Sequence, residues 1–238
     1  MYGLHILYKE FSDSHEIMVY ETEELEDERG HFRVLQFSNE AIQGAIDLNR
    51  PERIVLEYPR AIIHLMEFNN PSFENVFVIG HGIGTIAKHY ESKRVTVAEI
   101  DEKVVELSRQ YFGYGKDNVK IGDGRQILEQ EKPQTYEYIV LDAFTDRGTP
   151  LHLTSGEFFA MADEKLDSRG ALIMNLMGKG AKDKSIDAVR LTLGEQFTYV
   201  RSFFLPTEGS RDLQNIIMIG SHRPVGFRAR NMAGFTEY

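Results

Sequence analysis

Four groups of residues in this sequence have the types and the spacing that suit a nucleoside site. The stretch Gly80–Thr85 reads Gly-His-Gly-Ile-Gly-Thr after an apolar run, and such glycines let a ligand approach the backbone closely. Glu99 lies 19 residues after the first of these glycines, where an acid could accept hydrogen bonds from both hydroxyls of a ribose. Asp123 could accept the amino group of adenine, and Asp142 follows a further apolar run. Their coincidence predicts a nucleoside site.

The elements that must position these groups are strands that alternate with helices. Val76–Ile79 is a continuous apolar run, typical of a strand buried on both faces, whereas Asp101–Phe112 places its apolar residues on one helical stripe. This alternation predicts an α/β fold with a mostly parallel, doubly wound sheet that ends in an antiparallel pair. Because the carboxyl ends of parallel strands meet at one edge, the four groups should lie together. The other expected strands are Val95–Ile100, Val119–Ile121, Tyr138–Leu141, Ala171–Leu176, Thr198–Phe204 and Asn215–Ile219. The other expected helices are Ile83–Tyr90, Arg125–Gln130, Thr154–Leu166 and Lys184–Leu193. Thr154 and Glu157 have the spacing of a capping box at the start of their helix.

The first fifty residues have a different pattern. His15–Tyr20 and His31–Phe37 alternate apolar and polar residues, which predicts strands, and the six carboxylates of Glu21–Arg29 predict a solvated hairpin loop between them. Arg53–Phe68 has helical spacing, with Pro59 suited to the first turn of a second helix. The expected domains are a β-strand domain at residues 1–50, a nucleoside-binding catalytic domain at 51–222 and a C-terminal tail at 223–238.

Composition excludes several classes of protein. The chain has 238 residues, a formal net charge of −10 and no cysteine, so disulfides, thiolate metal sites and a cysteine nucleophile are excluded. The negative charge argues against a nucleic-acid partner and favours a cationic substrate. No apolar run reaches the roughly 18 residues that span a bilayer, and no signal peptide is evident, so we expect no membrane partner and a cytoplasmic location.

The glycine motif and the segments after it resemble those of a known family. The Gly-x-Gly-x-Gly spacing at Gly80 is similar to the first motif of class I S-adenosylmethionine enzymes, whereas dinucleotide enzymes favour Gly-x-Gly-x-x-Gly. Ala98–Asp101 resembles a Val-Glu-Ile-Asp motif, Asp123-Gly124 an Asp-Gly motif, and Tyr138–Asp142 the strand before a catalytic loop. Gln43 stands where that family has a glutamine near the substrate that donates the transferred group. Over residues 30–220 the chain resembles the spermidine synthase family, the aminopropyltransferases. The resemblance implies a Rossmann-like class I methyltransferase fold, a small N-terminal β-domain and a homodimer.

Three departures from that family bear on activity. Ile83 replaces the acid that, in the family, helps to hold the free amine of the donor. The loop Asp142–Asp146 places its two acids four positions apart, where the family has three. Of the family's Tyr-x-Glu-Met segment, Val55–Tyr58 keeps only Glu57. These changes resemble the spermidine synthase-like branch, whose loop often reads Asp-Ala-Phe.

The resemblance implies roles for individual residues. The donor, decarboxylated S-adenosylmethionine or S-adenosylmethionine, carries a sulfonium that activates its leaving group, and Asp142 is expected to orient the acceptor amine or take its proton. Tyr58 could line the acceptor tunnel, while Glu57, Asp146 and Asp212 could attract the distal ammonium groups of a polyamine. His81 and His152 flank the site without a partner at metal-ligand spacing, so no metal is expected. The expected donor-binding residues are Gln43, Gly80, Gly82, Gly84, Glu99, Asp123 and Gly124.

Three functions are consistent with these features. The first is a spermidine synthase-like transferase that moves an aminopropyl group from decarboxylated S-adenosylmethionine to a polyamine such as putrescine. The second is an S-adenosylmethionine-dependent methyltransferase acting on a small molecule. Ile83 favours it, because an acid at this position would repel the carboxylate of the ordinary donor. The third is a non-catalytic homologue that keeps the nucleoside pocket, which the altered catalytic loop favours.

Overall fold

The computed structural model describes residues 4–11, 16–37, 42–145, 148–179, 183–206 and 213–238. Within these ranges no helix combines the length and the apolar composition needed to cross a membrane. Two of the acids expected to attract a polyamine, Asp146 and Asp212, lie outside the described residues.

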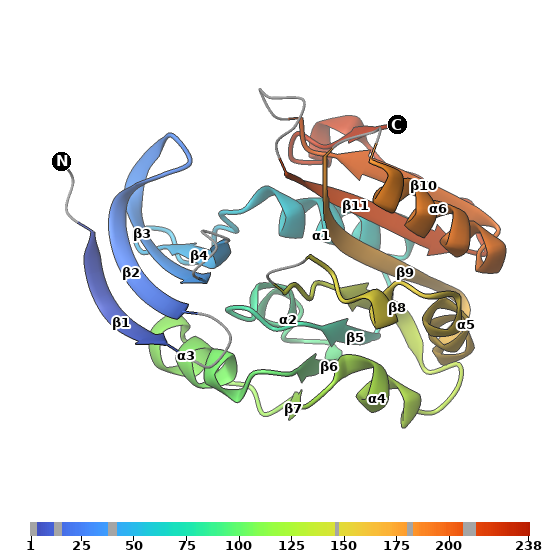
Figure 1. Cartoon of the computed structure of the whole chain (residues 1–238), viewed down its shortest axis with the longest axis horizontal. Coiled ribbons are helices and arrows are strands. Elements are labelled where there is room, and N and C mark those ends of the chain that lie inside the picture. Colours follow the sequence, from blue (N-terminus) through green and yellow to red (C-terminus); the bar gives the residue numbers. More distant parts are fainter. Residues whose placement is uncertain (1–3, 12–15, 38–41, 146–147, 180–182, 207–212) are drawn as a thin grey trace.

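A four-stranded antiparallel sheet forms the N-terminal part of the protein (Figure 1). Consecutive strands are neighbours in this sheet, so each connection is a hairpin. Ile17 and Val19 on one strand, and Phe32 and Val34 on the next, are buried at the period of two that a half-buried strand requires. The strands are β1 (His5–Phe11), β2 (Glu16–Leu25), β3 (Glu28–Phe37) and β4 (Ile42–Asp47).

An eight-stranded sheet with the order β12-β10-β11-β9-β8-β5-β6-β7 forms the rest of the framework. Strands β5 to β9 are parallel, and β11, β10 and β12 add an antiparallel edge, so the predicted mostly parallel sheet is confirmed. The chain runs from β5 outwards to β7 and returns to β8 on the other side, which places the topological switch point between β5 and β8. The strands are β5 (Asn75–Ile79), β6 (Arg94–Glu99), β7 (Val119–Ile121), β8 (Tyr136–Leu141), β9 (Leu166–Gly178), β10 (Tyr199–Phe204), β11 (Gln214–Ser221) and β12 (Thr236–Glu237).

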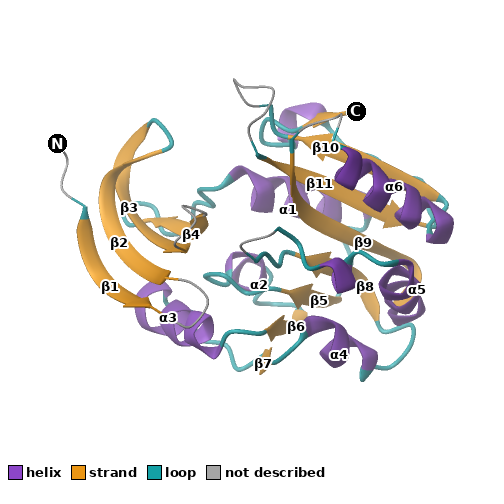
Figure 2. Ribbon diagram, in the orientation of Figure 1, coloured by secondary structure: helices purple, strands orange, loops and turns teal. Residues whose placement is uncertain are grey.

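Helices cover both faces of the large sheet (Figure 2). One face packs on α1, α2 and the C-terminal segment, and the other on α4, α5 and α6, so each face has its own apolar cluster. This double cover explains the continuous apolar runs of β5 and β8. The helices are α1 (Glu57–Asn69), α2 (Thr85–His89), α3 (Glu102–Phe112), α4 (Gly124–Glu129), α5 (Gly156–Lys165) and α6 (Lys184–Gln196), and the short 3₁₀ turns are η1 (Leu151–Leu153) and η2 (Ala229–Asn231).

Two local predictions were wrong. The segment Glu21–Arg29 is mostly strand, because Glu26 and Asp27 alone form the turn, both with positive φ (48° and 65°) as a tight hairpin turn requires. Helix α5 is capped by Ser155, whose hydroxyl accepts the N–H of Phe158, and not by the expected capping box at Thr154.

A single helix, α1, replaces the two helices expected between Arg53 and Phe68. It begins at Glu57, and Pro59 lies in its first turn, where the missing N–H has no intrahelical partner to lose. The start of α1 therefore brings Tyr58 to Asp142 at the switch point, whereas the carboxylate of Glu57 pairs with Arg60 of the same helix.

The C-terminal segment is part of the large framework. Val225, Met232 and Phe235 are buried in the cluster that also contains Val76 and Val78 of β5. Strand β12 pairs with β10 and extends the sheet by one strand. The sequence pattern of residues 223–238 did not predict this packing.

Candidate active site

The predicted site residues lie at one level because of strand register. Ile79 pairs with Ala98 of β6 and with Leu141 of β8, and Leu141 pairs with Met174 of β9. The residues that follow these four, one on each strand, are Gly80, Glu99, Asp142 and Asn175. The switch point thus gathers a glycine, two acids and an amide in one row.

The glycine loop between β5 and α2 tolerates no side chain at its glycines. Gly80, Gly82 and Gly84 have positive φ (95°, 54° and 82°), a region that favours glycine. A Cβ on Gly80 would overlap the carbonyl oxygen of Asp142, and one on Gly82 would lie 2.7 Å from the carbonyl oxygen of Gln43. The loop is therefore packed between the backbone of β4 and the end of β8.

Glu99 holds the glycine loop through its carboxylate. Its Oε2 accepts the backbone N–H of His81 at 2.8 Å, and its Oε1 accepts that of Asp101 at 2.9 Å. Burial raises the pKa of Glu99, and these backbone hydrogen bonds oppose that rise. The structure therefore gives this acid a role in shaping the loop beside its expected role at a ribose.

Asp142 is the centre of a partly buried polar cluster. Asn175 Nδ2 donates to Asp142 Oδ1 at 2.9 Å, and the hydroxyl of Tyr58 forms a second hydrogen bond to the same carboxylate. Burial raises the pKa of Asp142 to about 6, although both hydrogen bonds favour the ionised form. The same burial, with the charge of Asp142, raises the pKa of Tyr58 well above its usual value. A carboxyl of this pKa can exchange a proton near neutral pH.

Asn175 lies inside β9, which runs beyond the expected end of this strand at Leu176. Strand β9 continues to Gly178 because it pairs with β11 over its whole C-terminal half. Asn175 is 1% exposed, and its side-chain oxygen has no hydrogen-bond partner among the residues that the structure describes.

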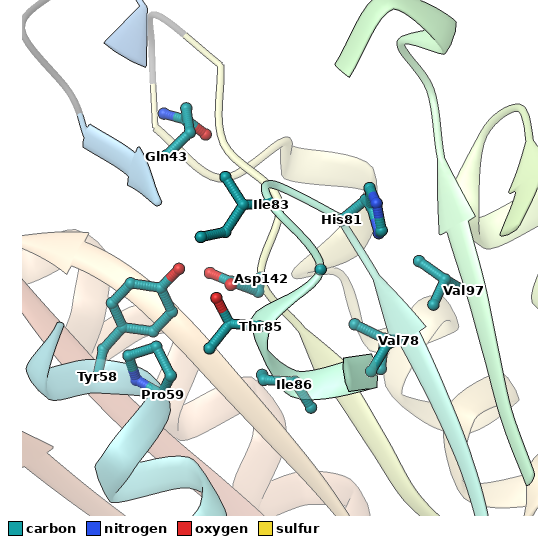
Figure 3. Close-up of a pocket in the computed structure, with 13 residues that line it drawn as sticks. Gln43, Tyr58, Pro59, Val78, His81, Ile83, Thr85, Ile86, Val97 and Asp142 are labelled. Atoms are coloured by element: carbon teal, nitrogen blue, oxygen red, sulfur yellow. The ribbon is translucent and has the colours of Figure 1, made fainter. Parts of the chain in front are cut away.

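A small cavity separates Tyr58 from the glycine loop (Figure 3). It measures about 10 Å³, which is room for one water. Figure 3 shows Tyr58, Asp142, Thr85 and Ile83 around this space, with Gln43 beyond Ile83. Gln43 and Tyr58, which the sequence predicted at the site, both line this cavity.

Ile83 packs against the N-terminal sheet. It is 5% exposed and belongs to an apolar cluster with residues of β2, β3 and α3. A Cβ on Gly44 of β4 would lie 2.6 Å from Ile83 Cγ1, so Gly44 makes room for this side chain. Ile83 therefore joins the glycine loop to the N-terminal sheet, a role that no sequence signal indicated.

Asp123 and Gly124 form the start of α4, beside the glycine loop's strand. Asp123 Oδ1 accepts the N–H of Gln126 at 3.0 Å, and its Oδ2 pairs with His152 Nε2 at 2.8 Å. A Cβ on Gly124 would overlap the side chain of Ile79, which explains why this position is a glycine.

The imidazole of His81 contacts the hydroxyl of Ser108 at 2.8 Å. The described parts of the chain contain no group of three or more side chains that could hold a metal ion.

Two exposed apolar residues near this edge were missed. Ile100 follows Glu99 directly and is 72% exposed, and Leu151 precedes His152 and is 86% exposed. Both residues adjoin a polar residue already expected at the site, Glu99 or His152. The signal was present in the sequence, because Ile100 lies at the end of a strand whose acid was already singled out.

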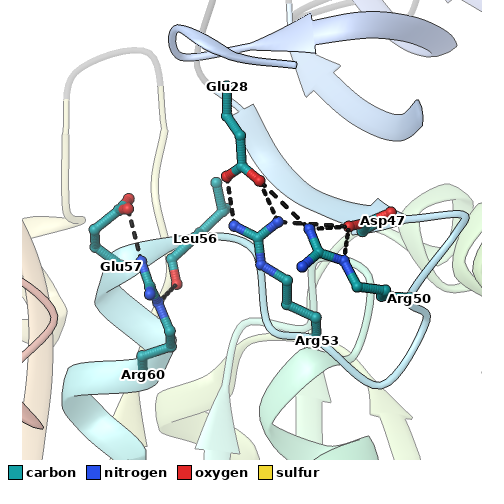
Figure 4. A network of polar contacts seen from close by, with 7 residues as sticks. All are labelled: Glu28, Asp47, Arg50, Arg53, Leu56, Glu57 and Arg60. Carbon is teal, nitrogen blue, oxygen red and sulfur yellow. Dashed lines mark hydrogen bonds and ion pairs between the residues drawn. The ribbon is translucent and has the colours of Figure 1, made fainter. Parts of the chain in front are cut away.

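A polar network joins the segment before α1 to the N-terminal sheet (Figure 4). Asp47 on β4 is 1% exposed and accepts from Arg50 Nε at 3.0 Å and from Arg53 Nη1 at 3.4 Å. Arg53 also binds both carboxylate oxygens of Glu28 on β3. Glu57 pairs with Arg60 at 2.7 Å. The substrate-binding residue expected at Glu57 is thus already neutralised in part by a neighbour.

Comparison with known proteins identifies relatives. The family model described as spermine/spermidine synthase domain matches residues 55–225. The chain is 28% identical to a polyamine aminopropyltransferase of Vibrio vulnificus (strain CMCP6) over 227 residues, which cover 89% of this chain and 72% of that relative. Several other curated relatives are matched over only about a third to a half of their own length.

Solved structures agree with the observed fold. A probable spermidine synthase from Corynebacterium glutamicum ATCC 13032 superimposes with a TM-score of 0.75 at 23% identity, over 91% of this chain and 80% of that one. Human methyltransferase-like protein 13 superimposes with a TM-score of 0.56 at 20% identity, over 74% of this chain and 86% of that one. These likenesses confirm the expected class I methyltransferase fold.

Proposed function

The chain belongs to the spermine/spermidine synthase family, and we propose that it transfers an aminopropyl group from decarboxylated S-adenosylmethionine to a polyamine such as putrescine. The observation that carries the proposal is the place of Asp142, at the switch point, against Gly80 and beside Tyr58 and Asn175. Ligands of doubly wound sheets bind at this point.

Asp142 would act on the acceptor amine. The donor supplies a sulfonium, whose carbon–sulfur bond breaks as the amine nitrogen forms its bond to the aminopropyl carbon, and methylthioadenosine leaves with the electron pair. The attacking amine must be neutral, so a carboxylate that takes a proton near neutral pH suits the step. A pKa of about 6 gives Asp142 this property.

Asn175 would hold the amine beside Asp142, and Tyr58 would line the path by which the amine enters. The oxygen of Asn175 is buried and, among the described residues, lacks a donor, so an N–H of the acceptor can supply one. The cavity beside Tyr58 has room for one nitrogen centre but not for a whole diamine. We infer that the acceptor reaches Asp142 when Tyr58 moves aside.

The donor nucleoside would lie along the edge formed by the glycine loop, Glu99 and Asp123. Glu99 would bind the ribose and Asp123, with Gly124, the base. The exposed side chains of Ile100 and Leu151 offer apolar contact for an adenine.

A methyltransferase that uses ordinary S-adenosylmethionine is the second candidate. Ile83 favours it, because this loop position is apolar and 5% exposed and so brings no carboxylate towards the donor tail. An ordinary donor would meet no repulsion there.

One experiment separates these functions. The protein is mixed with putrescine and either donor, binding is measured by calorimetry, and the product is identified by mass spectrometry. Aminopropylated putrescine from the decarboxylated donor supports the proposal, whereas a methylated product from the ordinary donor supports the second candidate. Binding of methylthioadenosine without any product would indicate the non-catalytic homologue.

We propose a homodimer in the cytoplasm, with a boundary between the two domains at residue 50. Sedimentation of the purified protein tests the dimer, and a monomer at micromolar concentration would contradict it.

A further inference from the structure

His152 and Asp123 form a close pair at the edge where the nucleobase would lie. His152 Nε2 and Asp123 Oδ2 are 2.8 Å apart, and the two side chains are 46% and 23% exposed. Since a carboxylate only accepts hydrogen bonds, the imidazole donates from Nε2. The pair joins the loop after β8 to the start of α4.

The carboxylate of Asp123 is held from two sides and keeps capacity for a ligand. Its Oδ1 accepts the backbone N–H of Gln126, and its Oδ2 accepts His152. An ionised carboxylate offers about four acceptor sites, two on each oxygen. One site on each oxygen therefore remains, and the exposed part of the side chain can present it to an amino group.

His152 is itself fixed in place. Arg125 Nη1 donates to its carbonyl oxygen at 3.0 Å, and the next residue, Leu153, is 3% exposed in the core. Leu151, on the other side, is 86% exposed. The η1 turn thus anchors the histidine between a buried leucine and a solvent-facing one.

We infer that His152 is a positioning residue for nucleobase recognition, which orients Asp123 to accept the 6-amino group of the donor's adenine. The inference rests on the proposed function, since it requires a nucleoside at this edge. A rigid acceptor discriminates an amino group better than a mobile one, because the ligand then loses less freedom on binding. His152 should therefore matter for ligands that carry the amino group, and little for ligands that lack it.

The test compares two nucleosides by calorimetry. One is methylthioadenosine, and the other is its purine analogue without the 6-amino group. The variants are His152→Ala, which removes the donor, and His152→Gln, whose amide can donate in its place. His222→Ala is the matched control, because His222 forms an equivalent pair with Asp163 at 2.9 Å and is 48% exposed, but lies after β11.

We expect His152→Ala to lower the affinity for methylthioadenosine about tenfold, a loss of the size that one charge-assisted hydrogen bond contributes. The affinity for the purine analogue should change less than about twofold. His152→Gln should recover most of the lost affinity for methylthioadenosine, and His222→Ala should leave the affinity for both nucleosides unchanged.

Two results would overturn the inference while the proposed function survives. The first is that His152→Ala loses the same factor of affinity for both nucleosides. The second is that the wild type binds both nucleosides with equal affinity. A wild type that binds neither nucleoside would contradict the proposed function itself, and the inference with it.

Discussion

Asn175 donates a 2.9 Å hydrogen bond to Asp142 because the two residues stand at the same level of neighbouring parallel strands. The pairing of Leu141 with Met174 sets this level. Asp142 is thereby held by β9 on one side and by Gly80 of the β5 loop on the other. The register of three strands, and not a flexible loop, positions the acid to which we assign the chemistry.

Asp142→Asn should abolish transfer while donor binding stays near normal. The exchange is almost isosteric and removes only charge and basicity, and general-base catalysis contributes about 10²–10⁴-fold. The measurement is the initial rate of product formation, with the dissociation constant of methylthioadenosine as the control. A rate within about threefold of the wild type would show that another group takes the proton.

The same variant should stabilise the protein at alkaline pH. Burial raises the pKa of Asp142 from the usual aspartate value of 3.8 to about 6 in the folded protein, so ionisation of this acid above pH 4 opposes folding. A rise of about two pKa units corresponds to at most about 3 kcal/mol at pH 8, and the difference should shrink towards zero near pH 4. Urea unfolding of both proteins at the two pH values measures it. A difference that grows as the pH falls would contradict the raised pKa.

The main effect of Ile83→Asp should be a loss of stability and not a change in donor preference. An acid at a 5% exposed position among apolar side chains lacks a partner, and an unpaired buried charge costs about 3–5 kcal/mol. Ile83→Val is the control and should cost about 0.5–1.5 kcal/mol. Thermal unfolding of both variants measures the contrast. Equal stability of the two variants would show that position 83 opens to solvent.

Gly80→Ala should destabilise the glycine loop by about 2 kcal/mol or more, because it adds a Cβ at positive φ and against the carbonyl of Asp142. Gly194→Ala in α6 is the matched control. No atom lies within 4 Å of its added Cβ, so it should stabilise the helix by about 1 kcal/mol. Urea unfolding compares the two, and a loss of stability in both would point to a general intolerance of alanine.

Glu99→Ala should strongly lower the affinity for methylthioadenosine and also lower the stability of the protein. Each hydrogen bond to a charged group contributes about 1.5–3 kcal/mol, and the variant leaves the N–H groups of His81 and Asp101 without an acceptor. Glu102→Ala, an exposed acid at the start of α3, is the control and should change neither quantity. Calorimetry and thermal unfolding give the two readouts. Unchanged nucleoside affinity would remove Glu99 from the site.

The sequence predicted the strand ends well and the contacts between domains poorly. Glu99, Asp123 and Asp142 lie at or just after the carboxyl ends of expected strands. The carboxyl ends of parallel strands must meet, so the local pattern was enough to bring these acids together. The contact of Ile83 with Gly44 depends on how the N-terminal sheet docks, which no local pattern encodes.

The network around Asp47 shows the same limit. It forms because β3 begins as early as Glu28, inside the segment expected to be a loop. Carboxylates in a charged run favour a solvated segment, but cross-strand pairing outweighed that preference.

The packing of the C-terminal segment affects when the chain can fold during its synthesis on the ribosome. The glycine loop and Asp142 leave the ribosome long before Val225, Met232 and Phe235, which complete the cluster beneath β5. Until those residues emerge, Val76 and Val78 lack part of their cover, and such exposed apolar surface invites chaperone binding and aggregation. A nascent chain halted before residue 225 should therefore carry every residue assigned to the chemistry and still fail to fold around them.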